Sequence, residues 1–318
     1  MNQKSKNITL VSILGMLVIC SVVLALTKHT TINTIGNKVL FSVEDTSEID
    51  RILISAAAGQ KIELVKKNDM WMLNERFKAE QNIVKVLLSI LKDMEVSRNV
   101  PKSQQEAIVK RIHENGYLVE IYVEERMIRS FLSVGNENKT VSYMMQKDED
   151  QPLIINIPGY RNYVAGIFEI PLNDWRDRLI LSANWHSLQE LSLNYSGFKE
   201  HDFTIRFKNT FLTIDGIHEL DTSAMMTYIE NFSYLQTDRY LDPGQNAKYD
   251  SLLKTPETAE ISVKDIDPDN SKNIRFFPLL PDDPMMLAHF REDNQMVLFE
   301  ARRIQHLFAV KSDFEKQK

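Results

Sequence analysis

The chain has 318 residues, which is enough for about two domains of roughly 150 residues each. Hydrophobic residues make up 43% of the chain and charged residues 26%, so wholesale disorder is excluded, and ten glycines and ten prolines are too few for a collagen-like or low-complexity protein. The net charge of −6 excludes a general attraction to nucleic acid, so no nucleic-acid partner is expected. The only cysteine, Cys20, excludes intramolecular disulfides, zinc sites made of cysteines and iron–sulfur clusters.

Residues 8–26 form an uncharged and mostly apolar run close to the N-terminus. As a helix this run would be about 28 Å long, close to the thickness of a bilayer core. We therefore predict a transmembrane anchor, with residues 1–7 in the cytoplasm and the rest of the chain translocated. A large exported domain without disulfides fits a bacterial envelope, so the predicted location is the inner membrane with the bulk of the chain in the periplasm.

Two other interpretations of this segment remain open. A cleaved signal peptide has a shorter apolar region and a small-residue cleavage site, whereas Thr27, Lys28 and His29 follow here. A lipoprotein would carry its lipid on Cys20, but Ile19 stands where a small residue is normal. An uncleaved anchor is the preferred interpretation.

After a polar tether at residues 27–40, the pattern predicts a first module at 41–172. Strand-like alternation occurs at 48–54, 61–65 and 71–73, with a hairpin turn at 67–69. An apolar stripe of period 3.6 from Ile83 to Met94 predicts a helix, and a second helix is expected at 104–114. Further strands are expected at 119–123, 127–134, 142–145 and 153–157.

The same order of elements recurs about 141 residues later, which predicts a second module at 187–310 followed by a tail at 311–318. For example, Asp221 follows Glu80 at this spacing, and Tyr228 follows Leu87. Helices do not alternate with single strands, so a parallel sheet is not expected. The predicted fold class is α+β: two tandem repeats of mainly antiparallel sheet, each with a helix pair packed on one face.

The sequence predicts no catalytic residue, metal ligand or cofactor. None of the seven histidines forms an H-x-H or H-x-x-x-H pair, and phosphate-loop and dinucleotide motifs are missing. Residues 265–270 are acidic, but Asn270 and Phe276 stand where a calcium loop needs glycine and glutamate, so a hairpin turn is expected. We therefore predict that the protein is not an enzyme.

The most distinctive local sequence lies in the segment between the modules, residues 173–186. It is Asp174, Trp175, Arg176, Asp177 and Arg178, in which the tryptophan can anchor in an apolar seam while the arginines pair with carboxylates. The preferred interpretation is a clasp that fixes one module against the other. A partner-binding hot spot is the alternative, because Trp and Arg are enriched at such spots.

The chain resembles the bacterial domain-of-unknown-function family 4340. The resemblance is carried by the Trp71-Met72-Leu73 strand and the apolar helix after it, by Tyr143-Met144-Met145, by Ile157-Pro158-Gly159, and by the segment Asp174–Arg178. It implies a membrane-anchored envelope protein of the kind often encoded beside auxiliary components of gliding-motility-type ABC transporters. The family has no established reaction, so the resemblance assigns no catalytic residue.

These observations favour a non-enzymatic, single-pass membrane protein whose exported modules bind other proteins, as an accessory or scaffold of an ABC-type transport or gliding-motility-like complex. The alternative is an exported small-molecule or glycan-binding protein that uses a groove between the modules, lined by exposed aromatic residues such as Tyr160, Tyr163 or Trp185. An envelope hydrolase is a third possibility, and it would need a nucleophile, a base and an orienting group within hydrogen-bond reach.

Overall fold

The computed structural model describes residues 38–57, 59–160, 163–208 and 211–316. The contacts divide the chain into two compact units. The N-terminal unit contains the described residues up to Lys67 together with Val84–Glu169, and the C-terminal unit contains Asn68–Ile83 together with the described residues from Ile170 onward. The predicted transmembrane anchor at 8–26 lies outside the described residues. Within them, no helix is both long and apolar enough to cross a bilayer.

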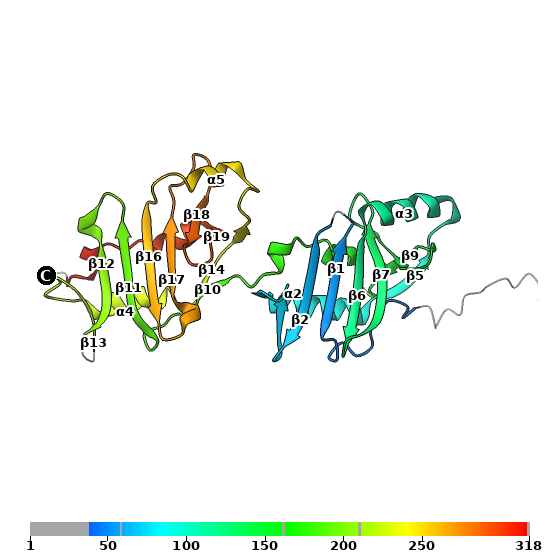
Figure 1. Ribbon diagram of the computed structural model, residues 1–318, viewed down its shortest axis with the longest axis horizontal. Coiled ribbons are helices and arrows are strands. Elements are labelled where there is room, and N and C mark those ends of the chain that lie inside the picture. The colour runs from blue at the N-terminus through cyan, green and yellow to red at the C-terminus, as the bar shows by residue number, and fades with distance from the viewer. Residues whose placement is uncertain (1–37, 58, 161–162, 209–210, 317–318) are drawn as a thin grey trace, which may run out of the picture. The chain divides into compact units, whose positions relative to one another are not determined.

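The first sheet consists of nine described strands in the order β4-β3-β2-β1-β6-β7-β8-β9-β5 (Figure 1). Asn68 and Asp69 have φ values of 48° and 65°, which form the two-residue turn expected between the second and third strands. The strands are β1 (Arg51–Ala56), β2 (Lys61–Lys67), β3 (Met70–Leu73), β4 (Phe77–Lys78), β5 (Glu95–Asn99), β6 (Tyr117–Val123), β7 (Arg126–Gly135), β8 (Ser142–Gln146) and β9 (Leu153–Asn156).

The second large sheet has the order β13-β12-β11-β16-β17-β18-β19-β15. Apart from β4, which has no counterpart, its strands follow the order of the first sheet. The spacing of 141 residues relates the starts of β3 and β13, at residues 70 and 211, and the starts of the first helices, at 81 and 222. The strands are β11 (Leu188–Tyr195), β12 (Phe203–Lys208), β13 (Phe211–Ile214), β15 (Arg239–Leu241), β16 (Ala259–Asp265), β17 (Lys272–Phe276), β18 (Met285–Phe290) and β19 (Gln295–Glu300), while β10 (Leu179–Leu181) and β14 (Leu235–Gln236) form a separate pair.

The prediction of mainly antiparallel sheet with a few helices is confirmed. Strand pairs in both units are antiparallel, from β1 with β2 to β18 with β19. Among the described residues, the helices of more than one turn are α2 (Gln81–Asp93), α3 (Lys102–Asn115), α4 (Thr222–Glu230) and α5 (Ala247–Leu252), and a short α6 (Ala301–Ile304) follows β19. The first three lie where the sequence pattern predicts them, and α5 is the second helix of the pair that the repeat predicts in the second module.

Each unit has helices on both faces of its sheet, which corrects the expectation that a helix pair would pack on one face. In the C-terminal unit, α4 packs against Ala288, Val297 and Phe299, whereas α5 packs against Leu287 and Leu298. Because neighbouring strand residues point to opposite faces, the two helices lie on opposite sides of β18 and β19. Strands covered on both faces are apolar without alternation, as 285–288 and 296–299 are.

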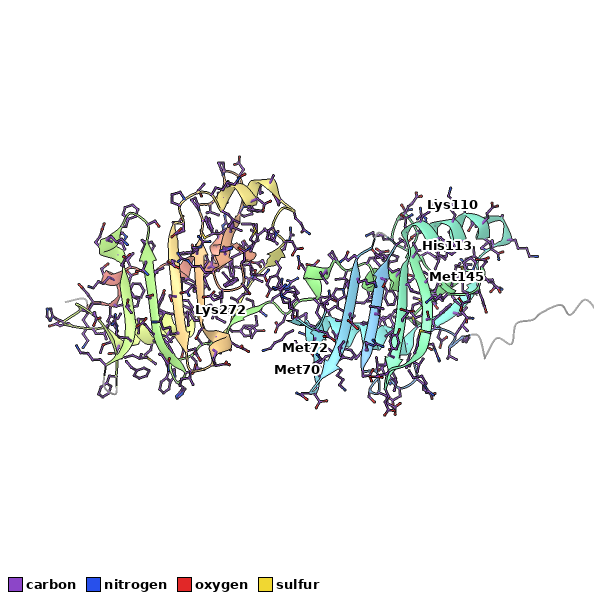
Figure 2. All side chains as sticks on the ribbon, viewed as in Figure 1. Met70, Met72, Lys110, His113, Met145 and Lys272 are labelled. Carbon is purple, nitrogen blue, oxygen red and sulfur yellow. The ribbon has the colours of Figure 1, made fainter. Side chains whose placement is uncertain are left out.

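The N-terminal unit also has helices on both faces of its sheet. Ile112 of α3 lies in one apolar cluster with Val134 and Met145, and Figure 2 shows Met145 below that helix. Phe131 points to the opposite face of β7 and makes an edge contact with Phe41, 5.5 Å between ring centres. The backbone N–H of Val43, two residues after Phe41, donates to the carbonyl of Leu91 in α2. The two helices therefore cover opposite faces here as well.

The second apolar face of the C-terminal sheet can be tested by truncation of Leu287, which is fully buried under α5. Leu287→Ala should lower the free energy of unfolding of this unit by about 2–5 kcal/mol, because it removes buried methyl groups and leaves a cavity. All three tryptophans, Trp71, Trp175 and Trp185, belong to the C-terminal unit, so their fluorescence during urea unfolding reports on it. Leu279→Ala is the matched control, since Leu279 is 46% exposed. Equal losses in the two variants would contradict the packing described above.

Candidate functional site

The segment that the sequence singles out begins with a single 3₁₀ turn, Leu172–Trp175, which follows Pro171. The Trp175 side chain is fully buried, and its indole N–H donates to the carbonyl of Ile170 at 3.3 Å. The Asp174 N–H donates to the Pro171 carbonyl at 3.0 Å. The indole ring is therefore buried and is not available to a ligand.

Residues 175–177 pair with residues 78–80, which begin at the last residue of β4. The Glu80 N–H donates to the Trp175 carbonyl at 2.8 Å, and the Asp177 N–H donates to the Lys78 carbonyl at 2.9 Å. Between these two bonds, Ala79 and Arg176 form an isolated antiparallel bridge. All of these residues belong to the C-terminal unit. These backbone hydrogen bonds fix the position of the Arg176 backbone and hence the starting point of its side chain.

The Arg176 guanidinium lies between two aromatic rings. Its central carbon is 3.8 Å from the centre of the Phe77 ring and 3.7 Å from the centre of the Tyr240 ring. One terminal nitrogen, Nη2, donates to Oε1 of Gln295 at 2.7 Å. The residue is only 6% exposed. Stacking on both flat faces leaves only the in-plane edge of the guanidinium for further hydrogen bonds.

The electrostatic environment of Arg176 combines burial with nearby charge. Burial lowers the pKa of the guanidinium from its ordinary value, although the charges of Asp242 and Asp293 and the neighbouring Tyr240 act in the opposite direction. Its Nε is buried and has no hydrogen-bond partner among the described residues. Burial also raises the pKa of Tyr240 to about 12, so its hydroxyl stays protonated and donates to the Asp177 carbonyl at 2.7 Å. Arg176 is thus a buried cation whose donors are not all used.

A pocket of about 200 Å³ opens beside Arg176. Its wall has cationic, anionic and apolar parts. One of the cationic residues is Lys272 at the start of β17, which is labelled in Figure 2. The lining residues all belong to the C-terminal unit: Lys78, Arg176, Leu179, Ile180, Tyr240, Asp269, Lys272, Phe290, Asp293 and Gln295.

The other residues of the predicted segment have backbone and turn roles. Oδ1 of Asp177 accepts the Leu179 N–H at 3.0 Å, and the exposed Arg178 accepts the Thr237 N–H at its carbonyl. Asp174 is half-buried. The sequence suggested arginine–carboxylate pairs within the segment, whereas Arg176 binds aromatic rings and Gln295 instead.

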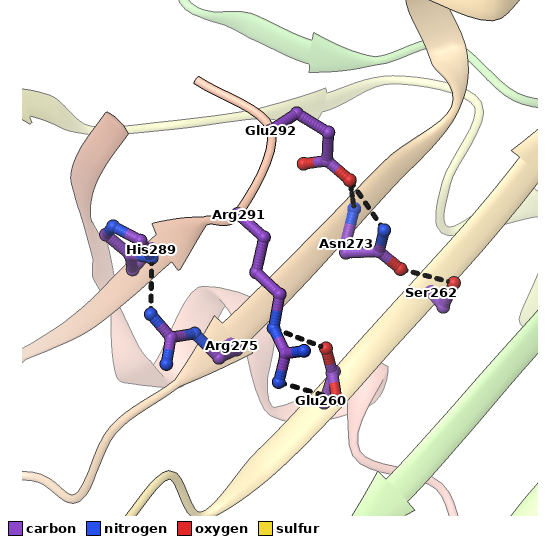
Figure 3. A network of polar contacts seen from close by, with 7 residues as sticks. All are labelled: Glu260, Ser262, Asn273, Arg275, His289, Arg291 and Glu292. Atoms are coloured by element: carbon purple, nitrogen blue, oxygen red, sulfur yellow. Dashed lines mark hydrogen bonds and ion pairs between the residues drawn. The ribbon is translucent and has the colours of Figure 1, made fainter. Parts of the chain in front are cut away.

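The sheet face opposite the α4 core carries a polar network, seen in Figure 3. His289 is 5% exposed, and its Nδ1 and Nε2 lie 2.8 Å from Nη2 of Arg275 and Oδ1 of Asn294. Because arginine can only donate, Nδ1 accepts and Nε2 donates, which describes a neutral imidazole. Arg291 pairs with Glu260 at 3.1 Å on the same face. Both imidazole nitrogens are satisfied, so His289 acts here as a structural residue.

The acidic run at residues 265–270 forms the expected hairpin turn between β16 and β17. Oδ1 of Asp267 accepts the Asp269 N–H at 3.0 Å, and Oδ2 of Asp265 accepts the Ser187 hydroxyl at 2.6 Å. Asn270 accepts both the N–H and the hydroxyl of Ser182 through Oδ1. These hydrogen bonds stabilise the turn that contains Asp269, one of the residues that line the pocket.

The aromatic residues named for a ligand groove have different environments. Tyr160 is 66% exposed and Trp185 43% exposed. Tyr163 is half-buried and its hydroxyl donates to Glu169; burial, and secondly this hydrogen bond, raise its pKa.

The fold and the site together define a class of protein: two antiparallel β units of the same strand order, one of which contains a polar pocket around a stacked arginine. The comparison with family models identifies the particular family. The model described as Domain of unknown function (DUF4340) matches residues 71–256, and the chain belongs to this family. Neither the curated proteins nor the solved structures gave a match to the chain.

Sequence reasoning found Arg176 but missed the residues around it. Lys78, Tyr240, Lys272 and Asp293 are far from the segment in sequence and have no motif in common.

Two substitutions of Arg176 distinguish the contribution of its ring stacking to stability from the contribution of its charge. Arg176→Lys should lower the free energy of unfolding by about 1–3 kcal/mol, because an ammonium cannot stack between two rings or keep the planar bond to Gln295. Arg176→Met should stay within about 1 kcal/mol of wild type, since a flexible apolar chain fills the same slot without burying an unpaired donor. Tryptophan fluorescence in a urea titration measures both, with the exposed Arg178→Met as the control. A methionine variant less stable than the lysine variant would show that the charge itself stabilises the fold.

Proposed function

We propose that this protein is a membrane-anchored, non-catalytic envelope protein that acts by binding another protein, as an accessory component of an ABC-type transport or gliding-motility-like complex. The membership of the family supports this proposal, as does the apolar run at residues 8–26. A tethered domain gains in local concentration at the membrane, so even a modest binding surface becomes effective.

The observation that carries the partner-binding part is the hairpin of β12 and β13 in the C-terminal unit. Phe207 is 45% exposed and Phe211 is 74% exposed. Phe211 pairs with Lys208 and Phe207 pairs with Leu212, so the two phenylalanines point to opposite faces of the hairpin. Leu212 packs against the apolar core, whereas the solvent face carries Phe211.

The same hairpin forms an edge of its sheet. β13 is the terminal strand in the order of that sheet, so one side of its backbone lacks a neighbouring strand among the described elements. Natural proteins usually protect such edges with charge or proline, and an aromatic edge is suited to receive a strand or an apolar side chain of a partner. We therefore place the partner surface at Phe207, Phe211 and the outer side of β13.

The anchor is tested by fractionation of cells that express the full chain. The protein should stay in the membrane pellet after alkaline carbonate extraction, and its intact mass should include residues 8–26, because a run of this length matches the bilayer core. Cys20→Ser should remain in the pellet, whereas loss of the anchor in this variant would favour a lipoprotein. Protease added to spheroplasts should degrade the bulk of the chain, and a protected chain would overturn the proposed orientation.

The partner surface is tested by cross-linking in the intact envelope. A photo-reactive phenylalanine analogue at position 211 should yield a discrete cross-linked product, whereas the same analogue at Ile266, which is 66% exposed on a different turn, should not. Phe211→Ser should weaken capture of that partner by about 30-fold, the effect of losing a hot spot worth roughly 2 kcal/mol. Unfolding stability should change by no more than about 0.5 kcal/mol, since the ring is mostly exposed. Equal cross-linking at positions 211 and 266 would refute the surface.

A further inference from the structure

We propose that the pocket beside Arg176 binds a small zwitterion of the amino-acid or dipeptide class. This goes beyond the proposed docking of a partner protein and does not depend on it, because the pocket lies within the C-terminal unit and Phe207 and Phe211 are not among its lining residues.

The anionic end of the ligand is recognised by Arg176. The rings of Phe77 and Tyr240 hold the guanidinium in one plane, and Nη2 is already bonded to Gln295. Among the described residues, no other hydrogen bond to this guanidinium is present, and its Nε is a buried donor without a partner. A carboxylate matches the in-plane donors of a guanidinium better than any other common group. Binding such a group would offset part of the cost of burying this cation.

The cationic end is recognised by the carboxylates on the wall. The pocket is lined by two lysines, Lys78 and Lys272, and by Asp269 and Asp293. Within the part of the chain that the structure describes, none of these four side chains forms an ion pair. A simple anion would face two carboxylates, and a simple cation would face Arg176 and two lysines. A ligand that carries both signs satisfies both sets, so the mixed charge of the wall favours a zwitterion.

The size and the apolar part of the pocket restrict the ligand further. A volume of about 200 Å³ is smaller than the pockets of roughly 300–1,000 Å³ that hold drug-sized ligands, so it suits an amino acid or a small dipeptide. Leu179, Ile180 and the Phe290 ring form the apolar part of the wall. We therefore expect a ligand with a short aliphatic side chain between or beside its charged groups.

The test uses the full chain purified in detergent micelles and isothermal titration calorimetry. The probes are the aliphatic L-amino acids and their dipeptides, with acetate, inorganic phosphate and n-propylamine as probes of a single charge. At least one amino acid or dipeptide should bind with a Kd below about 1 mM, and the single-charge probes should bind at least about tenfold more weakly. The proposal is overturned if no zwitterion binds below about 10 mM, or if acetate or phosphate binds as tightly as the best zwitterion.

Substitutions in the pocket test which residues bind the anionic end of the ligand and which bind the cationic end. Arg176→Met and Lys272→Gln should weaken zwitterion binding by about tenfold or more, because they remove cations from the wall. Asp293→Asn should also weaken it, but should strengthen binding of acetate and phosphate, and its amide oxygen can still accept the Gln295 N–H that Asp293 accepts now. Lys254→Gln and Asp282→Asn are matched controls, since both residues are exposed in the same unit and lie outside the pocket. Circular dichroism verifies folding, and pocket variants that bind like the controls would refute the site.

Discussion

The C-terminal unit depends on a short antiparallel contact between residues 78–80 and 175–177. Two backbone hydrogen bonds, at 2.8 and 2.9 Å, join stretches that are almost a hundred residues apart in the chain. The buried Trp175 holds one side of this contact in place, and the adjacent Arg176 is thereby directed between two rings. Closing so long a loop costs conformational entropy, and the burial of the indole helps to offset that cost.

A buried, stacked arginine with an unpaired donor lowers the stability of a fold. An apolar side chain of similar size would pack in the same slot without desolvating a charge, so packing alone gives no reason for a guanidinium there. A buried donor without a partner requires an explanation, and a bound group that accepts its hydrogen bond is one. The electrostatic arrangement of the pocket is therefore better understood as recognition than as a contribution to stability.

The shared strand order of the two sheets places comparable elements in comparable positions, yet the units differ where function is proposed. The first sheet begins with β4, which has no counterpart in the second sheet, whereas the second sheet begins with β13, which corresponds to β3. In the C-terminal unit, the terminal strand exposes Phe211, while the pocket draws its residues from β4, the segment at 176–180 and the ends of β15, β17, β18 and β19. A repeated scaffold thus supports two separate surfaces, one apolar and one charged.

The sequence by itself determined the local elements, because side-chain periodicity records which faces are buried. The alternation at β1, β2 and β3, the apolar stripe of α2 and the constant spacing of 141 residues all predicted elements that the structure contains. Only the tertiary structure decided that α4 and α5 lie on opposite faces, since the path of a connection across a sheet leaves no periodic pattern. It alone also brought Lys78, Tyr240, Lys272 and Asp293 to Arg176, because contacts between residues so far apart in sequence arise from the pairing of strands and not from local propensity.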